Sequence, residues 1–239
     1  MIAPEVVIQN LCQVRERIKD ACRACGREPG TVRLIGVTKT LEASAIRPAL
    51  EGGLEDVGEN YIQELKGKVG LLPAVRWHFI GHLQRNKASL AVELATYIHS
   101  LDSLALIRAV DRHCVTQNRD VRGLLEVRLG GEDSKSGLDP EEVWPLLEEL
   151  AKEPPQRLRL VGLMTVPPPT EDPEGNRPHF CRLREMVQKI GKQNWSFWQG
   201  QELSMGMSDD YQAAIAEGAT MVRVGRAIFG ARPPKTALN

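Results

Sequence analysis

The chain has 239 residues, and its 31 lysines and arginines balance its 31 aspartates and glutamates. This neutral balance provides no basic field for nucleic acid and no polybasic run for an anionic membrane surface. No apolar run approaches the ~20 residues of a membrane span, and Glu5 interrupts the N-terminus too early for a signal peptide. We therefore expect a cytoplasmic protein that binds neither membranes nor nucleic acid.

Short apolar runs alternate with amphipathic stretches along the chain. A helix is expected first, over about residues 4–25, and eight strands follow it. The predicted strands cover residues 33–39, 54–58, 76–81, 97–100, 121–129, 159–165, 203–207 and 221–224. This alternation predicts a parallel sheet, and eight repeats favour a closed barrel over an open doubly wound sheet. The predicted fold class is α/β, a single (β/α)8 TIM barrel with an extra N-terminal helix, in one domain over residues 1–239 with a core at about 4–232.

Two helices have clear start signals. Asp139 is an expected N-cap, Pro140 suits the first helical position, and Glu142 completes a capping box. A later helix is expected to start at Ser208 and to end at Gly218.

The five cysteines are scattered and odd in number, which argues against a disulfide scaffold. Cys22 and Cys25 form a C-x-x-C pair, but no further ligands at matching spacing complete a zinc site. Both continue a helical stripe with Val14 and Ile18, so we interpret them as buried reduced thiols and predict no metal site.

Lys39 ends the first predicted strand, where it shares a face with Ile35 and Val37. The active sites of such barrels lie at the C-terminal mouth of the strands. A lysine held at an apolar mouth loses hydration, which lowers its pKa, and the neutral amine can then form a Schiff base with an aldehyde. Taken alone, the position also fits a solvated lysine in the loop after the strand.

The end of the chain predicts a phosphate site. Arg223 and Gly225 share a face, and residues 225–230 are typical of a tight turn into a short helix whose first N–H groups bind phosphate. The loops after strands seven and eight are the usual phosphate site of a barrel, and Ser204 lies at the expected end of strand seven. Gly225 can equally serve the turn alone.

Six stretches match motifs of a known family in order, between about Arg15 and Arg232. They cover residues 58–61, 77–84, 134–137, 162–165, 203–208 and 222–225. Together they resemble the pyridoxal 5′-phosphate (PLP) homeostasis protein family, a single barrel similar to the N-terminal domain of alanine racemase. The segment 130–136 also resembles a Walker A loop, but Ser134 replaces the glycine required before Lys135, so we reject ATP binding there.

The resemblance implies a role for each matched residue. Lys39 carries PLP as a Schiff base, and Arg223 faces the pyridine nitrogen. The other implied contacts are Ser204, Gly225 and the amide of Arg226 at the phosphate, and Asn60, His82 and Met164 along the ring. The resemblance leaves open whether the Arg226 side chain joins the phosphate site and whether Lys135 contacts the cofactor.

Three of these residues also have local interpretations that need no ligand. Asn60 with Gln63 fits a helix capping box. His82 fits a capping or packing role, and Met164 fits barrel filling. A local role and a cofactor contact can coexist at Asn60.

Arg223 bears on whether the protein is an enzyme. PLP enzymes that use the ring as a full electron sink pair its nitrogen with a carboxylate, whereas an arginine cannot accept that proton. Alanine racemase tolerates an arginine but needs a second domain and a tyrosine from a partner subunit. This chain stops soon after strand eight, and its three tyrosines show no match to that role.

We therefore expect a monomeric PLP-binding protein of intracellular PLP (vitamin B6) and amino-acid homeostasis, with no dedicated reaction. Its expected partners are PLP and PLP-dependent enzymes that receive it. The alternative is a residual amino-acid racemase or another Schiff-base barrel enzyme.

Overall fold

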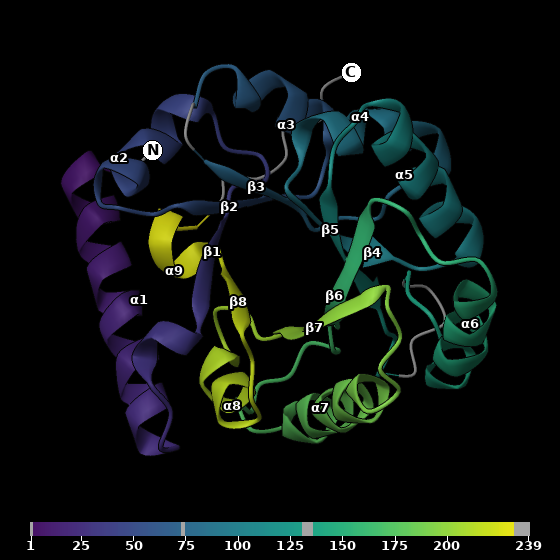
Figure 1. The fold of residues 1–239 in the computed structure, drawn as a ribbon. Coiled ribbons are helices and arrows are strands. Elements are labelled where there is room, and N and C mark those ends of the chain that lie inside the picture. The colour runs from purple at the N-terminus through teal and green to yellow at the C-terminus, as the bar shows by residue number, and fades with distance from the viewer. Residues whose placement is uncertain (1, 73–74, 131–135, 232–239) are drawn as a thin grey trace.

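Eight parallel strands close into a barrel in the computed structural model, which describes residues 2–72, 75–130 and 136–231. The strands are paired in chain order, and β8 returns to β1 with Arg33 opposite Met221 (Figure 1). Their bounds are β1 Arg33–Val37, β2 Asp56–Glu59, β3 Arg76–Phe79, β4 Tyr97–Leu101, β5 Val121–Glu126, β6 Leu158–Met164, β7 Trp198–Ser204 and β8 Met221–Val224. The predicted barrel is confirmed.

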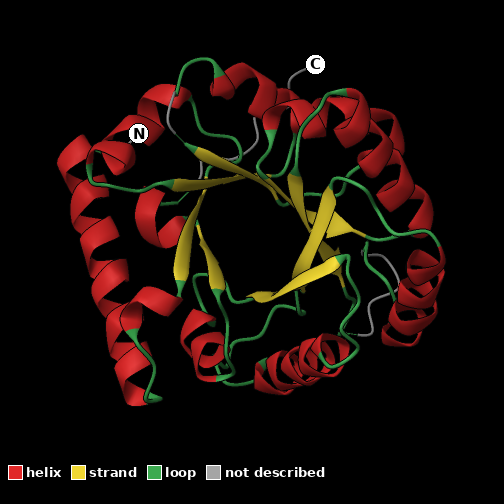
Figure 2. Ribbon diagram, in the orientation of Figure 1, coloured by secondary structure: helices red, strands yellow, loops and turns green. Residues whose placement is uncertain are grey.

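Helices surround the barrel on all sides (Figure 2). Their bounds are α1 Pro4–Ala24, α2 Ala43–Glu51, α3 Ile62–Val69, α4 Ala88–Leu94, α5 Leu104–Thr116, α6 Pro140–Lys152, α7 Arg177–Gly191, α8 Tyr211–Ala216 and α9 Arg226–Phe229, with short 3-10 turns η1 Pro29–Thr31 and η2 Arg85–Lys87. None of the helices in the described part of the chain is long and apolar enough to cross a membrane.

The extra helix α1 is the predicted N-terminal helix, and it packs against α2, α8 and α9. Its buried stripe consists of Val7, Leu11, Val14, Ile18 and Cys22. Figure 1 shows α9 between α1 and the barrel, so the chain after β8 returns to the helix that begins the fold. Within the described residues, no group of His, Cys, Asp and Glu side chains could hold a metal ion.

The predicted start of α6 and the predicted stop of α8 at Gly218 are confirmed, whereas the predicted start of α8 at Ser208 is wrong. Asp139 and Glu142 form a reciprocal capping box, in which the Asp139 amide donates to Glu142 Oε2 at 2.9 Å. The helix α8 begins at Tyr211, and its N-cap residue Asp210 makes no side-chain cap bond. Asp210 Oδ1 instead accepts the Met207 amide of the preceding loop at 2.6 Å. The helix ends before Gly218, which takes the left-handed conformation with φ +96° that favours glycine.

Strand β7 departs from the expected bounds, because it begins at Trp198 and ends at Ser204 instead of covering residues 203–207. The first half of the strand is polar and partly exposed, so it carries no apolar run. Gly206 then turns the chain with φ +89°, and a Cβ there would lie 2.6 Å from the Cβ of Ala214. Met207 and Ser208 consequently lie in a loop beyond the strand.

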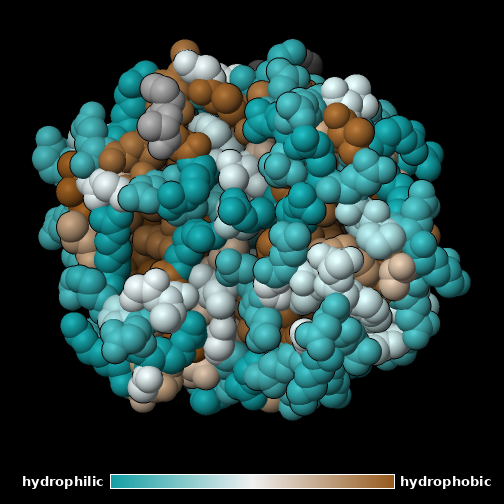
Figure 3. Space-filling view, in the orientation of Figure 1, coloured by the Kyte–Doolittle hydropathy of each residue, from teal (hydrophilic) through white to brown (hydrophobic). Residues whose placement is uncertain are grey.

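The apolar core has two layers. The larger one lies between the strands and the surrounding helices. The smaller one fills the barrel with Ile35, Tyr97, Leu124, Val161, Met164 and Met221. The surface is mostly hydrophilic on the face in Figure 3, where apolar side chains lie recessed between polar ones.

Candidate cofactor site

A pocket of about 230 Å³ lies at the C-terminal mouth of the barrel. Five of the eight predicted site residues line it, namely Lys39, Asn60, Arg223, Gly225 and Arg226. The other residues around it are Val37, Ile80, Val166, Met207, Ser208 and Asp209. Residues distant in the sequence, from the first strand to the last, therefore meet at the end of the barrel where active sites of this fold are found.

Three predicted site residues do not line this pocket. His82 lines a neighbouring pocket that also touches Asn60. Ser204 and Met164 are buried inside the barrel, with 0% and 1% of their surface exposed. Lys135, for which the resemblance leaves a cofactor contact open, lies outside the described residues.

The backbone on both sides of Lys39 is held by side chains of β2 and α3. The carbonyl of Thr38 accepts a hydrogen bond from Lys68 Nζ at 2.9 Å, and the Thr38 hydroxyl donates to Glu59 Oε1 at 2.6 Å. On the other side, the amide of Thr40 donates to Glu64 Oε2 at 2.6 Å. These contacts fix the turn that follows β1 on either side of the pocket lysine.

Two of the residues around Lys39 have unusual surroundings: the backbone of Thr40 is strained, and Lys68 forms a buried ion pair. Thr40 has φ +66°, a conformation that is rare for a β-branched residue and that persists only where its surroundings impose it. Lys68 and Glu59 form a buried ion pair at 2.6 Å, with 8% and 0% of their side chains exposed. Burial raises the pKa of Glu59, against the hydrogen bonds from Lys68 and Thr38, which lower it.

Asn60 presents a polar atom with no partner among the described residues. Its Oδ1 is buried and accepts no hydrogen bond there. The expected capping box is not formed, because α3 begins at Ile62 and its N-cap Tyr61 makes no side-chain cap. Gly81 presses against this residue, since a Cβ there would lie 2.1 Å from the Asn60 carbonyl oxygen. The loop after β3 therefore packs tightly against the backbone of Asn60.

The loops after β7 and β8 form a polar corner of the pocket. Ser208 is half-buried there, beside the start of α9 at Gly225 and Arg226. The first amides of a helix have no intrahelical acceptor and attract anions. The Arg226 guanidinium forms an ion pair with Asp209 Oδ2, and both side chains are mostly exposed.

Arg223 is a buried cation at the floor of the pocket, with 4% of its surface exposed. Its Nη1 donates to the hydroxyl of Ser204 at 2.7 Å, and its Nη2 donates to the Thr165 carbonyl at 2.8 Å. Burial lowers the pKa of Arg223 to about 10, although the charges of Asp210 and Glu126 act against this shift. The guanidinium is therefore charged at neutral pH.

The remaining two predicted residues have contacts away from the pocket. His82 is 56% exposed and its Nδ1 lies 3.4 Å from Asp102 Oδ2. Met164 packs in the apolar layer inside the barrel, as the barrel-filling interpretation predicts.

Ser208 is the main pocket residue that the sequence interpretation missed. The sequence predicts a helix start at Ser208, because strand seven is expected to continue to Met207. The signal that could have found it is its place in the loop after strand seven, which is half of the usual phosphate site of a barrel. The two buried histidines His78 and His99, which lead away from Ser204, were also missed.

The closed barrel and the lysine-containing pocket at its mouth are those of a barrel with a cofactor site, and the comparison with known sequences identifies its family. Residues 9–233 match the profile of the alanine racemase N-terminal domain family. A curated relative from Pseudomonas aeruginosa, named pyridoxal phosphate homeostasis protein, is 42% identical over 228 residues, which are 95% of this chain and 96% of the relative. The chain belongs to the pyridoxal phosphate homeostasis protein family.

Solved structures agree with this membership. PipY of Synechococcus elongatus, solved with PLP bound, is 34% identical, has a TM-score of 0.82, and aligns over 94% of this chain and all of its own. An alanine racemase of Clostridium difficile has a TM-score of 0.67 at 16% identity, and this chain covers 58% of its length. The likeness to the racemase shows the fold alone.

Proposed function

We propose that this chain binds PLP in the mouth pocket, holds it covalently through Lys39, and serves intracellular PLP and amino-acid homeostasis without a dedicated reaction. The observation that carries the proposal is the convergence of Lys39, Arg223 and the Ser208 corner on one small pocket. Family membership supports it, because the relatives carry the homeostasis name and PipY was solved with PLP.

The residues around the pocket match three groups of PLP, namely its aldehyde, its ring nitrogen and its phosphate. Lys39 supplies an amine for the aldehyde, and Arg223 supplies a charged donor for the ring nitrogen. Ser208 and the first amides of α9 supply donors for the phosphate. Asn60 lines the same pocket, and its buried Oδ1 accepts no hydrogen bond from the described residues, which is unusual for a buried polar atom.

The phosphate role falls to Ser208 in this proposal, in place of Ser204. The hydroxyl of Ser204 is fully buried and already bonded to Arg223 and His99. Ser208 lies in the same loop as the pocket wall and beside the start of α9. The side chain of Arg226 is directed to Asp209, so its backbone amide is the group that we assign to the phosphate.

Two features of the pocket support the proposed absence of a dedicated reaction, and the first is Arg223. PLP supplies an aldehyde and, when its ring nitrogen is protonated, a strong electron sink. Arginine is a donor with no acceptor, and therefore it cannot hold a proton on that nitrogen as a carboxylate does. Among the described residues lining the pocket there is also no tyrosine that could act as a second base. These features support a binding role over racemisation.

We also infer that the protein acts as a monomer in the cytoplasm and passes PLP to recipient enzymes. The near-neutral charge and the lack of a membrane-spanning helix in the described part of the chain agree with this setting. Light scattering of the purified protein measures its mass directly. Transfer is measured by mixing loaded protein with a cofactor-free PLP enzyme and following the recovery of that enzyme.

The test of the proposed function is the absorbance spectrum of the purified protein, with and without added PLP. We expect bound PLP in the wild type and in Lys66→Ala, which removes an exposed lysine of α3. We expect Lys39→Ala to lose the absorbance of covalently attached PLP. Retention of that absorbance in Lys39→Ala would contradict the assignment.

A further inference from the structure

A line of polar side chains runs through the otherwise apolar interior of the barrel. Asp56, His78, His99, Ser204 and Arg223 come from β2, β3, β4, β7 and β8, and all of them are buried. Consecutive members are joined by short hydrogen bonds. The distances are 2.9 Å from Asp56 Oδ1 to His78 Nε2, 2.9 Å from His78 Nδ1 to His99 Nε2, 2.9 Å from His99 Nδ1 to Ser204 Oγ, and 2.7 Å from Ser204 Oγ to Arg223 Nη1.

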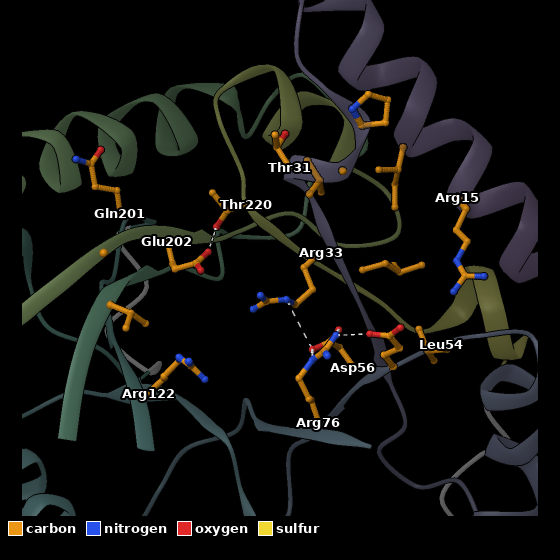
Figure 4. A pocket seen from close by; sticks show the side chains of 18 of the residues that line it. Arg15, Thr31, Arg33, Leu54, Asp56, Arg76, Arg122, Gln201, Glu202 and Thr220 are labelled. Atoms are coloured by element: carbon orange, nitrogen blue, oxygen red, sulfur yellow. Dashed lines mark hydrogen bonds and ion pairs between the residues drawn. The ribbon is translucent and has the colours of Figure 1, made fainter. Parts of the chain in front are cut away.

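This line of hydrogen-bonded side chains ends at the carboxylate of Asp56, at the N-terminal end of the barrel. Figure 4 shows Asp56 beside Arg33 and Arg76 in a separate basin. Arg76 donates to both carboxylate oxygens of Asp56, at 2.9 and 2.8 Å. Burial by itself raises the pKa of Asp56, but the hydrogen bonds and charges of Arg76 and His78 outweigh it and lower the pKa to about 2. Asp56 is therefore an acceptor only.

The two ends determine the direction of every hydrogen bond between them. Because Asp56 only accepts, His78 must donate from Nε2. Burial lowers the pKa of both histidines, so each ring is neutral and carries a single proton. His78 Nδ1 then accepts from His99 Nε2, and His99 Nδ1 accepts from the hydroxyl of Ser204.

The upper end agrees with the same direction. The guanidinium of Arg223 only donates, so the oxygen of Ser204 accepts from it while its proton goes to His99. All four bonds therefore donate from Arg223 toward Asp56. Hydrogen bonds aligned in this way polarise and strengthen one another.

We propose that Asp56, His78, His99 and Ser204 are positioning residues for Arg223, joined in a one-directional hydrogen-bond chain across the barrel. The chain links the guanidinium at the pocket floor to an anion at the opposite end of the barrel. Among the described residues, no carboxylate forms an ion pair with Arg223 within 4 Å, although a buried cation needs compensation. The chain also orients the guanidinium, because Nη1 is held by Ser204 and Nη2 by Thr165.

The histidine tautomers test the chain without any cofactor. We expect ¹⁵N–¹H correlation spectra of the PLP-free protein at pH 7 to show His78 and His99 as neutral rings with the proton on Nε2. The variants His78→Gln and His99→Gln assign the two signals among the five histidines of the chain. A proton on Nδ1 of either ring, or a doubly protonated ring, would overturn the directed chain.

The positioning role rests on the proposed function and is tested by PLP affinity. We expect Ser204→Ala to raise the Kd for PLP by about tenfold or more, because a hydrogen bond to a charged group is lost. Asp56→Asn should also raise it, whereas Glu202→Gln, which removes a second acid of the same basin, should leave it unchanged. Equal affinities of wild type, Ser204→Ala and Asp56→Asn would overturn the role. If the wild type fails to bind PLP, the proposed function is wrong. The tautomers of His78 and His99 in the PLP-free protein still show whether the directed hydrogen-bond chain is present.

Discussion

The hydroxyl of Ser204 lies 2.7 Å from Nη1 of Arg223 and inside the barrel, so this serine supports the pocket arginine from below. Ser208, four residues later, lines the pocket itself. The two serines of one motif thus have different surroundings, and the difference leads to distinct effects on ligand binding.

We predict that Ser208→Ala weakens the binding of PLP but not that of pyridoxal, which lacks the phosphate. The loss of one hydrogen bond to a charged group costs about 1.5–3 kcal/mol, which is roughly tenfold to a hundredfold in affinity. Ser204→Ala should weaken both ligands, because it acts through Arg223. Equilibrium dialysis with both compounds separates the two effects. A loss of pyridoxal binding in Ser208→Ala equal to its loss of PLP binding would remove Ser208 from the phosphate site.

The ion pair that supports Lys39 predicts a large effect on stability. Lys68→Met leaves Glu59 buried without its partner, and breaking a buried pair in this way costs about 3–5 kcal/mol. Lys66→Met changes an exposed lysine of the same helix and should change the free energy of unfolding by less than about 0.5 kcal/mol. Urea unfolding measures both. Similar losses in the two variants would show that the Lys68 pair has no special role.

The buried histidines predict that stability falls in mild acid. Burial lowers the pKa of His78 and His99 below the unfolded value of 6.5, so the unfolded chain takes up protons that the folded chain refuses. Their contribution is fully present above pH 6.5 and is lost as the pH falls toward the folded pKa values. Each histidine adds a slope of about 1.4 kcal/mol per pH unit in that window.

The measurement is the free energy of unfolding in urea at several pH values from 7.5 down to 5. His99→Gln should reduce the slope of the free energy of unfolding against pH. His113→Gln changes a histidine of α5 that takes no part in the hydrogen bonds from Arg223 to Asp56, and it should leave the slope unchanged. Asp56 adds a second window, because its pKa of about 2 lies below 3.8, so its stabilisation is lost only between these values. A flat profile between pH 7.5 and 5 would contradict neutral buried histidines.

The proposed role of Arg223 predicts that bound amino acids exchange their α-proton with solvent very slowly. When the loaded protein is incubated with L-alanine in D₂O, NMR should show loss of the α-proton far below ordinary enzymatic rates of ~1 s⁻¹. Arg223→Glu should raise this exchange if the variant still binds PLP, because a carboxylate can hold a proton on the ring nitrogen. Turnover by the wild type at ~1 s⁻¹ or more would favour the racemase alternative.

The fold could be predicted from the sequence because most strands are apolar runs between helices with clear periodicity. Strand β8 has the expected bounds, and α1 carries the expected stripe. Strand β7 could not be placed, since its first half has polar, partly exposed side chains and its pairing depends on backbone hydrogen bonds with β6.

Lys39 and Arg223 could be predicted because each bears its own chemistry and lies near the C-terminal end of a strand. Strand β1 ends at Val37, however, so Lys39 lies in the turn after it and does not end the strand as expected. The supporting residues could not be predicted, because each one acquires its role only when the barrel closes. His78 and His99 are 21 residues apart in the sequence, and their contact follows from the pairing of β3 with β4. The family resemblance implies a phosphate contact for Ser204, and nothing in the sequence shows that its hydroxyl is buried beside Arg223 and His99.

In the proposed function, Lys39 is the residue that holds PLP. Borohydride reduction of the PLP-loaded protein, followed by peptide mass mapping, identifies the modified lysine directly. We expect the pyridoxyl group on the peptide that contains Lys39, and we expect no such peptide from Lys39→Ala. A stoichiometric pyridoxyl group on another lysine of the wild type, with Lys39 unmodified, would exclude Lys39 as the residue that holds PLP.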